Sequence, residues 1–323
     1  MAWFPTDADC LDYLEWLRWP IGFVCPSCSQ RGWQLADKRY MCSGCGTRTS
    51  VTAGTIFDRT RTPLTVWFTT CWMFATQKDG VSALSLQLAL DIGSYHTAWA
   101  MLHRLRSVLV NPGRERLSGT VEMDETFIGG EEPGLLGGRA KGKKVLVGIA
   151  IERKDPKGFG RCRIAPLTDA STDSLRAFLI DHVQDGTKIV TDGWQPYREA
   201  AADPYVHERL VVPGRQAGQQ LPGVHRVASL VKRWLLGTHQ GAADAAHLPN
   251  YLNEFVFRFN RRTSRSRGML FYRLLELAVQ HQPIRYCDLI VHPKPREILP
   301  LARSLGHPPS LERPAANRPW RMG

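Results

Sequence analysis

Four cysteines near the N-terminus stand at the spacing of a zinc site. They form two C-x-x-C pairs, Cys25-Pro-Ser-Cys28 and Cys42-Ser-Gly-Cys45, separated by 13 residues. Two residues between cysteines let both thiolates reach one ion, and a site closed by four cysteines builds structure without doing chemistry. A redox dithiol would be one C-x-x-C beside a βαβ pattern, whereas both pairs here lie in polar, hairpin-like sequence. We therefore expect structural zinc at Cys25, Cys28, Cys42 and Cys45.

Two acidic residues, Asp124 and Asp192, could carry catalysis. Asp124 lies within the apolar stretch 121–128, and Asp192 ends another at 189–192. A carboxylate on a buried strand is costly unless it is compensated, and a divalent cation held between two strands would compensate it. Two such ions can assist an in-line phosphoryl transfer. The alternative for Asp192 is a turn cap, because Gly193 follows it directly.

The elements that would position these aspartates follow from the periodicity of apolar residues after residue 118. Strands come first and alternate with helices later, which indicates a mixed sheet flanked by helices. The predicted strands are 121–128, 145–151, 161–167 and 188–192, and the predicted helices are 172–182, 224–236 and 247–260.

Helices are predicted on both sides of the cysteines. A short helix at 7–17 precedes the cysteines and should pack on the zinc ribbon, and the segment 60–110 that follows them is predicted to be helical. A buried helix begins after Pro63, and two further helices at 82–90 and 94–108 flank a tight turn at 91–93. A helix, a glycine turn and a basic helix are typical of a helix-turn-helix, in which Arg104 and Arg106 would contact DNA, although ordinary helical bundles share the pattern.

The composition favours a nucleic-acid partner. The chain has 323 residues and a formal net charge of +12, which attracts polyanions. The sequence contains no apolar run long enough to span a bilayer and no N-terminal signal pattern. We therefore expect a cytoplasmic, nucleoid-associated protein with no membrane partner. The remaining cysteines are scattered singly, which fits free thiols in a reducing compartment.

Two basic segments are candidates for phosphate contacts. The first is a glycine-rich loop at 134–144 without the spacing of a nucleotide-binding loop. Its basic residues are Arg139, Lys141, Lys143 and Lys144. The second is an arginine run that includes Arg261 and Arg262, for which a solvated helix end is the alternative.

From residue 4 to residue 279 the chain resembles the DDE-type insertion-sequence transposases that carry a zinc ribbon before an RNase H-like core. The resemblance rests on the ribbon, on Val-Glu-Met-Asp-Glu-Thr-Phe-Ile around Asp124, on Asp-Gly-Trp-Gln-Pro-Tyr from Asp192, and on two later segments, 232–239 and 254–262. It implies that Asp124 and Asp192 are the first two members of a catalytic triad.

The third member departs from the usual pattern. In the family it is most often a glutamate seven positions before a basic residue on a helix, and here His225 stands seven before Lys232. Seven residues are about two helical turns, so both side chains share one face. His225 would bind metal while Lys232 and Arg233 meet DNA phosphates. Imidazole suits Mn²⁺ better than Mg²⁺. The alternative is a histidine facing solvent or DNA, with Glu254 as the third ligand.

The resemblance implies cleavage at transposon ends and attack of the freed 3′-hydroxyl on target DNA, with Mg²⁺ or Mn²⁺ as the catalytic ions. Double-stranded DNA is the expected partner, and joining two ends implies at least a dimer. The expected domains are 1–55 (helix and zinc ribbon), 60–110 (helix-turn-helix), 118–280 (RNase H-like) and 281–323 (a Pro/Arg-rich tail, extended or disordered). A non-catalytic DNA-binding regulator and a structure-specific nuclease remain as alternative functions.

Overall fold

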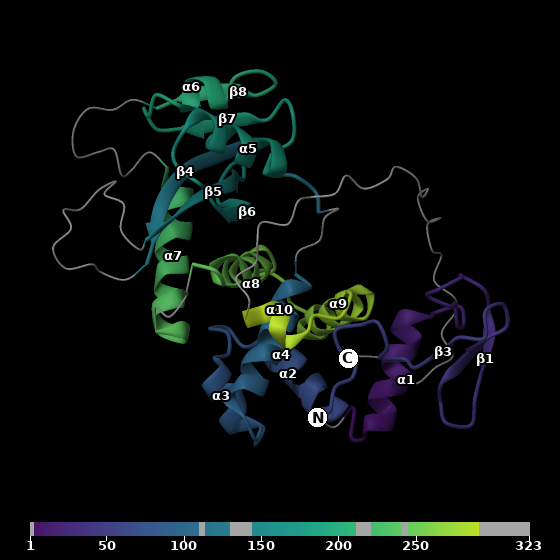
Figure 1. Cartoon of the computed structure of the whole chain (residues 1–323). Helices are drawn as coiled ribbons and strands as arrows, with labels where there is room; N and C mark the ends of the chain where they lie inside the picture. The colour runs from purple at the N-terminus through teal and green to yellow at the C-terminus, as the bar shows by residue number, and fades with distance from the viewer. Residues whose placement is uncertain (1–2, 110–113, 130–143, 211–220, 241–244, 291–323) are drawn as a thin grey trace.

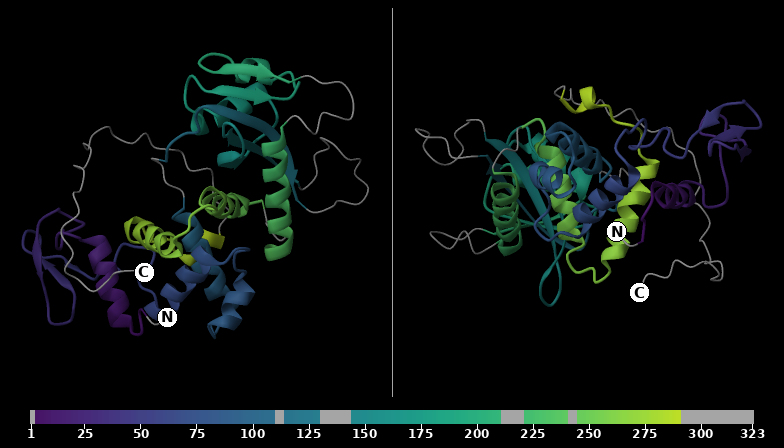
Figure 2. Two further views of the ribbon diagram at one scale, coloured as in Figure 1. Left: turned by 180° about the vertical axis from the view of Figure 1, so that it is seen from behind. Right: turned by 90° about the horizontal axis from the view of Figure 1, so that it is seen from below.

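The computed structural model describes residues 3–109, 114–129, 144–210, 221–240 and 245–290 (Figure 1). A zinc-ribbon fold and a group of helices form one end of the molecule, and a mixed β-sheet forms the other (Figure 1, Figure 2). This arrangement confirms the predicted multidomain layout of ribbon, helical segment and mixed sheet flanked by helices.

The zinc ribbon packs on the first helix, as its sequence suggested. Helix α1 (Asp7–Arg18) begins at Thr6, whose side chain forms a capping box with Asp9. The ribbon is a three-stranded antiparallel sheet, within the described residues, of β1 (Gly32–Gln34), β2 (Tyr40–Cys42) and β3 (Arg48–Thr49). The Tyr40 hydroxyl donates to Glu15 of α1 at 2.5 Å, and the Tyr40 ring stacks on Phe23.

A cluster of helices continues the same apolar core. Helices α2 (Leu64–Thr76), α3 (Ala83–Ala89) and α4 (Tyr95–Ser107) follow the ribbon, and α3 and α4 flank the predicted turn at 91–93. Helix α9 (Arg267–Gln280) returns from the other end of the chain and packs against α1 and α2. Its apolar side chains, among them Phe271 and Leu274, are buried in the core of this cluster.

The larger sheet holds five strands in the order β6-β5-β4-β7-β8 within the described residues. Its central strand β4 (Thr120–Ile128) pairs antiparallel with β5 (Val145–Arg153), which pairs antiparallel with β6 (Phe159–Pro166). On the other side, β4 pairs parallel with β7 (Lys188–Thr191), which pairs parallel with β8 (Val206–Arg209).

Helices cover both faces of this sheet. Helix α7 (Pro222–His239) and helix α8 (Leu248–Asn260) lie on one face, and α5 (Thr172–His182) with the short α6 (Tyr197–Ala200) lies on the other (Figure 1). Strand pleating separates the two cores. Val190 joins the core under α7 and α8, whereas its neighbour Ile189 joins the core under α5.

A buried ion network joins the helical cluster to the sheet region. The Glu254 carboxylate of α8 is fully buried and accepts from Arg106 of α4 at 2.8 Å and from Arg258 at 2.8 Å. Arg258 also donates to the carbonyl oxygens of Phe74 in the last turn of α2 and of Gln77, its C-cap residue. Burial would raise the pKa of Glu254, but the two arginines outweigh burial and lower it.

Two findings differ from the sequence expectation. Residues 286–290, placed in the Pro/Arg-rich tail, form helix α10 (Tyr286–Ile290), whose Leu289 is buried, while 291–323 lie outside the described residues. Helix α9, within the expected RNase H-like range, instead packs with α1 and α2. Among the helices that the structure describes, none is both long and apolar enough to cross a bilayer.

The buried network makes a stability prediction. Glu254→Gln should lower the free energy of unfolding by about 3–5 kcal/mol, because it leaves the buried Arg106 guanidinium without a counter-charge.

The same network makes the stability depend on pH. Since the pKa of Glu254 is lowered in the folded state, the stabilisation by its carboxylate is present above the unfolded-state pKa and is lost as the pH falls through the folded-state pKa. Chemical denaturation from neutral to acidic pH measures both effects. Asp37→Asn, which breaks the exposed pair with Arg39, is the control and should change the stability far less, because water screens an exposed ion pair. An equal cost for the two variants would contradict the prediction.

Candidate active site and zinc site

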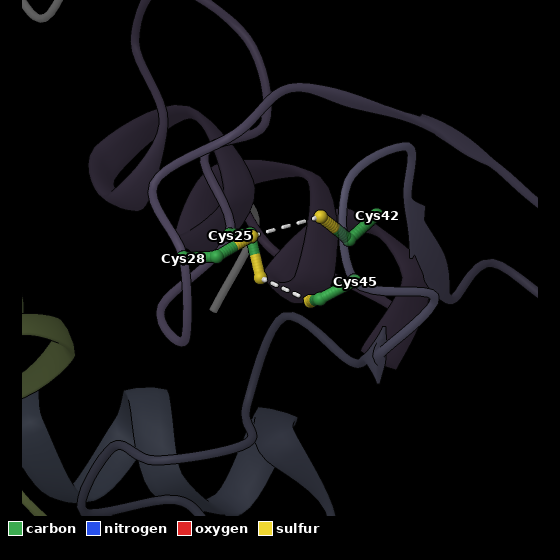
Figure 3. Close-up of side chains that lie close together, drawn as sticks. All are labelled: Cys25, Cys28, Cys42 and Cys45. Atoms are coloured by element: carbon green, nitrogen blue, oxygen red, sulfur yellow. Dashed lines mark hydrogen bonds between the residues drawn. The ribbon is translucent and has the colours of Figure 1, made fainter.

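The four cysteines meet at one point between the two knuckles of the ribbon (Figure 3). Their sulfur atoms all lie within 4.8 Å of one another, with Cys25 to Cys45 at 3.7 Å and Cys28 to Cys42 at 3.3 Å. A tetrahedral zinc ion with Zn–S bonds of about 2.3 Å needs sulfurs about 3.8 Å apart. Hydrogen bonds with Thr47 lower the pKa of Cys45 to about 6, which favours the thiolate that zinc binds. The cluster is therefore suited to a structural zinc ion.

Asp124 lies on β4, and Asp192 directly follows the neighbouring strand β7. Strands β4 and β7 are parallel neighbours, and Glu122 is in register with Val190. Asp124, two residues after Glu122 on the same strand, continues on the face of Glu122. Asp192, two residues after Val190, begins the turn that follows β7. Neighbouring strands are about 4.8 Å apart. The pairing thus places the backbone of the two predicted catalytic aspartates at the same end of neighbouring strands, with Asp124 on β4 and Asp192 directly after β7.

Tyr197 links the segments that carry the two aspartates. Its hydroxyl donates to the carboxylate of Glu125, the residue after Asp124, at 2.7 Å. Burial raises the pKa of Tyr197 well above its ordinary value, and the carboxylates of Glu125, Asp124 and Asp192 raise it further. All three negative charges therefore act on one buried hydroxyl. The turn after Asp192 is closed by its own carboxylate, which accepts from the Trp194 amide at 2.9 Å.

Helix α7 brings His225 to the face of Glu122 and Asp124. Helix α7 contacts both β4 and β5, and His225 lies half-buried in its first turn. Farther along α7, the Lys232 ammonium donates to the Thr126 hydroxyl of β4 at 2.8 Å. Among the residues that the structure describes, the cysteine cluster is the sole group of three or more candidate ligands within 4.8 Å. Asp124, Asp192 and His225 thus do not form so tight a group.

Several predicted DNA contacts gather near the end of β4. Burial lowers the pKa of Lys232, and the positive charge of Lys144 lowers it further, so these two lysines are neighbours. Arg233 is exposed next to Lys232. Arg139, Lys141 and Lys143 lie outside the described residues.

Other predicted DNA contacts are occupied within the protein. Arg106 is buried in its ion pair with Glu254, so the predicted phosphate contact by Arg106 is wrong. Arg104 donates to the Ile284 carbonyl at 2.9 Å. Arg261 and Arg262 stack on Phe257 and Phe259, with guanidinium carbons 4.2 and 4.0 Å from the ring centroids. Arg104, Arg261 and Arg262 therefore make contacts within the protein.

Two functional features were missed in the sequence, and Glu254 proves to be a structural residue. The Glu254 carboxylate is enclosed by Arg106 and Arg258 in the buried network, which argues against its alternative role as third ligand. The missed features are the buried Glu122 carboxylate and the bond between Tyr197 and Glu125. The partners lie 101 and 72 residues apart along the chain, so no local sequence pattern predicts these bonds.

Two parts of the chain match known protein families. Residues 5–48 match the transposase zinc-ribbon domain, and residues 116–260 match the ISXO2-like transposase domain. A protein described as an uncharacterized protein in transposable element ISH50 of Halobacterium salinarum is 27% identical over 279 residues, which cover 79% of this chain and 91% of that protein. The chain therefore carries a transposase zinc-ribbon domain followed by an ISXO2-like transposase domain.

Proposed function

We propose that the protein cleaves DNA at the inverted-repeat ends of its element and transfers the freed 3′-hydroxyl to target DNA. The observation that carries this proposal is the parallel pairing of β4 with β7, in register at Glu122 and Val190. Asp124 stands two residues farther along β4, and Asp192 stands two residues beyond Val190, directly after the end of β7. Two carboxylates at the same end of neighbouring strands are the oxygen-rich arrangement that divalent cations prefer. The family match supports a transposase, and the aspartates support metal-dependent phosphoryl transfer as its chemistry.

Each residue of the site has a distinct task in this proposal. Asp124 and Asp192 would hold the divalent ions, and His225 would complete the set from α7. Bound Mg²⁺ or Mn²⁺ would activate the attacking water or hydroxyl and stabilise the leaving oxygen. A set of two oxygen donors and one imidazole accommodates Mn²⁺ more readily than Mg²⁺.

DNA would lie across the face that carries α7. Lys232 and Lys144 supply positive charge near the end of β4, the strand that carries Asp124, and Arg233 is exposed next to Lys232, which suits the phosphate backbone. The zinc ribbon and the pair α3–α4 would read the ends of the element. Synapsis of two ends requires at least a dimer in the active complex.

The first prediction concerns the aspartates and the histidine. Asp124→Asn, Asp192→Asn and His225→Ala should each reduce strand transfer by at least about 100-fold, because even the partners of metal ligands cost about 10- to 100-fold when removed. The assay combines the full-length protein, labelled DNA with the element's own ends, a target plasmid, and Mg²⁺ or Mn²⁺. Asp181→Asn, an exposed carboxylate on α5 at the opposite face, should leave activity unchanged.

The outcomes of this assay separate the competing functions. Cleavage without joining would point to a structure-specific nuclease. DNA binding with neither reaction, in wild type under both metals, would point to a non-catalytic regulator. Full activity of His225→Ala alongside inactive aspartate variants would remove the histidine from the ligand set.

The second prediction concerns the basic residues near β4. Lys232→Ala should weaken binding to DNA of any sequence and reduce by about one the slope of log affinity against log salt concentration, since one phosphate contact is lost. Fluorescence anisotropy at several salt concentrations measures this slope. The control is Lys157→Ala, an exposed lysine in the β5–β6 turn at the other end of the sheet. An unchanged slope for Lys232→Ala would rule out its phosphate contact.

The third prediction concerns zinc. The purified protein should hold one zinc ion per chain, and Cys42→Ser should abolish it and unfold the ribbon, because structural zinc contributes folding energy directly. Elemental analysis and hydrogen exchange of residues 20–50 test both statements. Cys287→Ser, an exposed thiol outside the cluster, should retain the metal. Zinc retained at full stoichiometry by Cys42→Ser would contradict the assignment.

A further inference from the structure

Helix α7 begins without a cap from its own sequence. Within the described residues, Leu221 at the N-cap makes no side-chain bond and the first turn holds no acidic residue. The first free amides of a helix need acceptors, and the helix dipole makes its N-terminus positive. Pro222 has no amide hydrogen, and the His225 amide bonds the Leu221 carbonyl at 3.1 Å. The amides of Gly223 and Val224 therefore need a partner from elsewhere.

Glu122 of strand β4 is that partner. Its Oε2 accepts from the amides of Gly223 at 2.8 Å and Val224 at 3.1 Å. Its other oxygen accepts from the Arg153 guanidinium at 2.6 Å, which balances the charge of a fully buried carboxylate. A buried carboxylate is retained only when it is paired and hydrogen-bonded in this way.

Gly223 allows the carboxylate to approach this closely. A Cβ atom at this position would lie 2.9 Å from Oε2 of Glu122 and 2.6 Å from the ring of Phe159. No side chain fits there without displacing its neighbours. The glycine and the glutamate thus form one matched contact between α7 and β4.

This contact fixes the alignment of α7 with the strand that carries Asp124. Glu122, Asp124 and Thr126 share one face of β4 because strand side chains alternate. Glu122 bonds α7 at residue 223 and Thr126 bonds it at Lys232. The four strand steps between them span roughly 13 Å, and the nine helix steps span roughly 13.5 Å. The helix therefore follows the strand across Asp124 and is attached on both sides of it.

We propose that Glu122 is a positioning residue for the active site. By holding the first turn of α7 against β4, it sets where His225 stands relative to Asp124 and Asp192. Glu122 is bonded to helix amides and to Arg153, so it acts through α7. This inference rests on the proposed function, because Glu122 would position His225, the proposed third metal ligand of the phosphoryl-transfer site.

The test compares Glu122 with a matched glutamate of the same sheet. Glu152 of β5 lies in register with Val121, is held by Arg161 at 2.7 Å, and bonds the amides of Ser118 and Arg161. Glu122→Gln and Glu152→Gln therefore each remove one strand carboxylate with an arginine partner. Glu122→Ala gives the stronger form of the change, and Glu122→Gln remains informative if the alanine variant does not fold.

Hydrogen exchange of the full-length, zinc-loaded protein measures whether Glu122 protects the first amides of α7. The amides of residues 223 and 224 should exchange about tenfold faster in Glu122→Gln, because a charge-assisted bond is replaced by a neutral one. They should be unaffected in Glu152→Gln. Unchanged exchange in the first turn of α7 for both Glu122 variants would overturn the proposal.

Binding of Mn²⁺ alone reads the consequence for the site. The dissociation constant for Mn²⁺ should rise about 10- to 100-fold in Glu122→Gln, the range for residues that orient a ligand, and stay constant in Glu152→Gln. Faster exchange with unaltered Mn²⁺ affinity would overturn the link between Glu122 and the site. A wild type that binds Mn²⁺ but joins no DNA would instead reject the proposed function and leave the positioning role decided by the other readouts.

Discussion

The pleat of strand β4 is the constraint on which the candidate site depends. Successive residues point to opposite faces, so Glu122, Asp124 and Thr126 face α7 while Glu125 faces the side where Tyr197 donates to it. A shift of one residue in the pairing of β4 with β7 would send Asp124 to the wrong face. The antiparallel register with β5, which runs the length of β4, resists such a shift. One strand thus supplies a candidate ligand, a helix cap and a link to the Asp192 turn.

The sequence predicted the elements better than their contacts. Asp124 is recognisable because it interrupts an apolar strand, Asp192 because it directly follows one, and the cysteine spacing is a local pattern. Arg106 was misjudged, since an arginine near a helix end is exposed or buried according to what packs there, and its partner Glu254 is 148 residues away. Glu122 was overlooked for the same reason, because the amides that it bonds begin 101 residues later. Long-range pairing of charges leaves no local periodicity.

The far end of α7 is held by the helical cluster. The Trp234 indole and the Thr238 hydroxyl both donate to the Asp79 carbonyl, at 3.1 and 2.6 Å. Gly80 follows with a positive φ of 77°, and a Cβ there would lie 3.1 Å from the Trp234 indole nitrogen. A left-handed glycine thus lets the segment after α2 approach α7 closely. Arg258 bonds the same segment at the Gln77 carbonyl.

Helix α7 is therefore held at both ends by different parts of the molecule. Its first turn is bonded to β4 through Glu122, whereas its last turns are bonded to the segment between α2 and α3. A helix transmits displacement along its axis because its backbone bonds keep its length fixed. If α3 and α4 read the ends of the element, a shift of that pair on binding DNA would reach α7 through Asp79. The Glu122 contact would then limit how far His225 moves, because it holds the first turn of α7 to β4 while the Asp79 carbonyl holds the last turns.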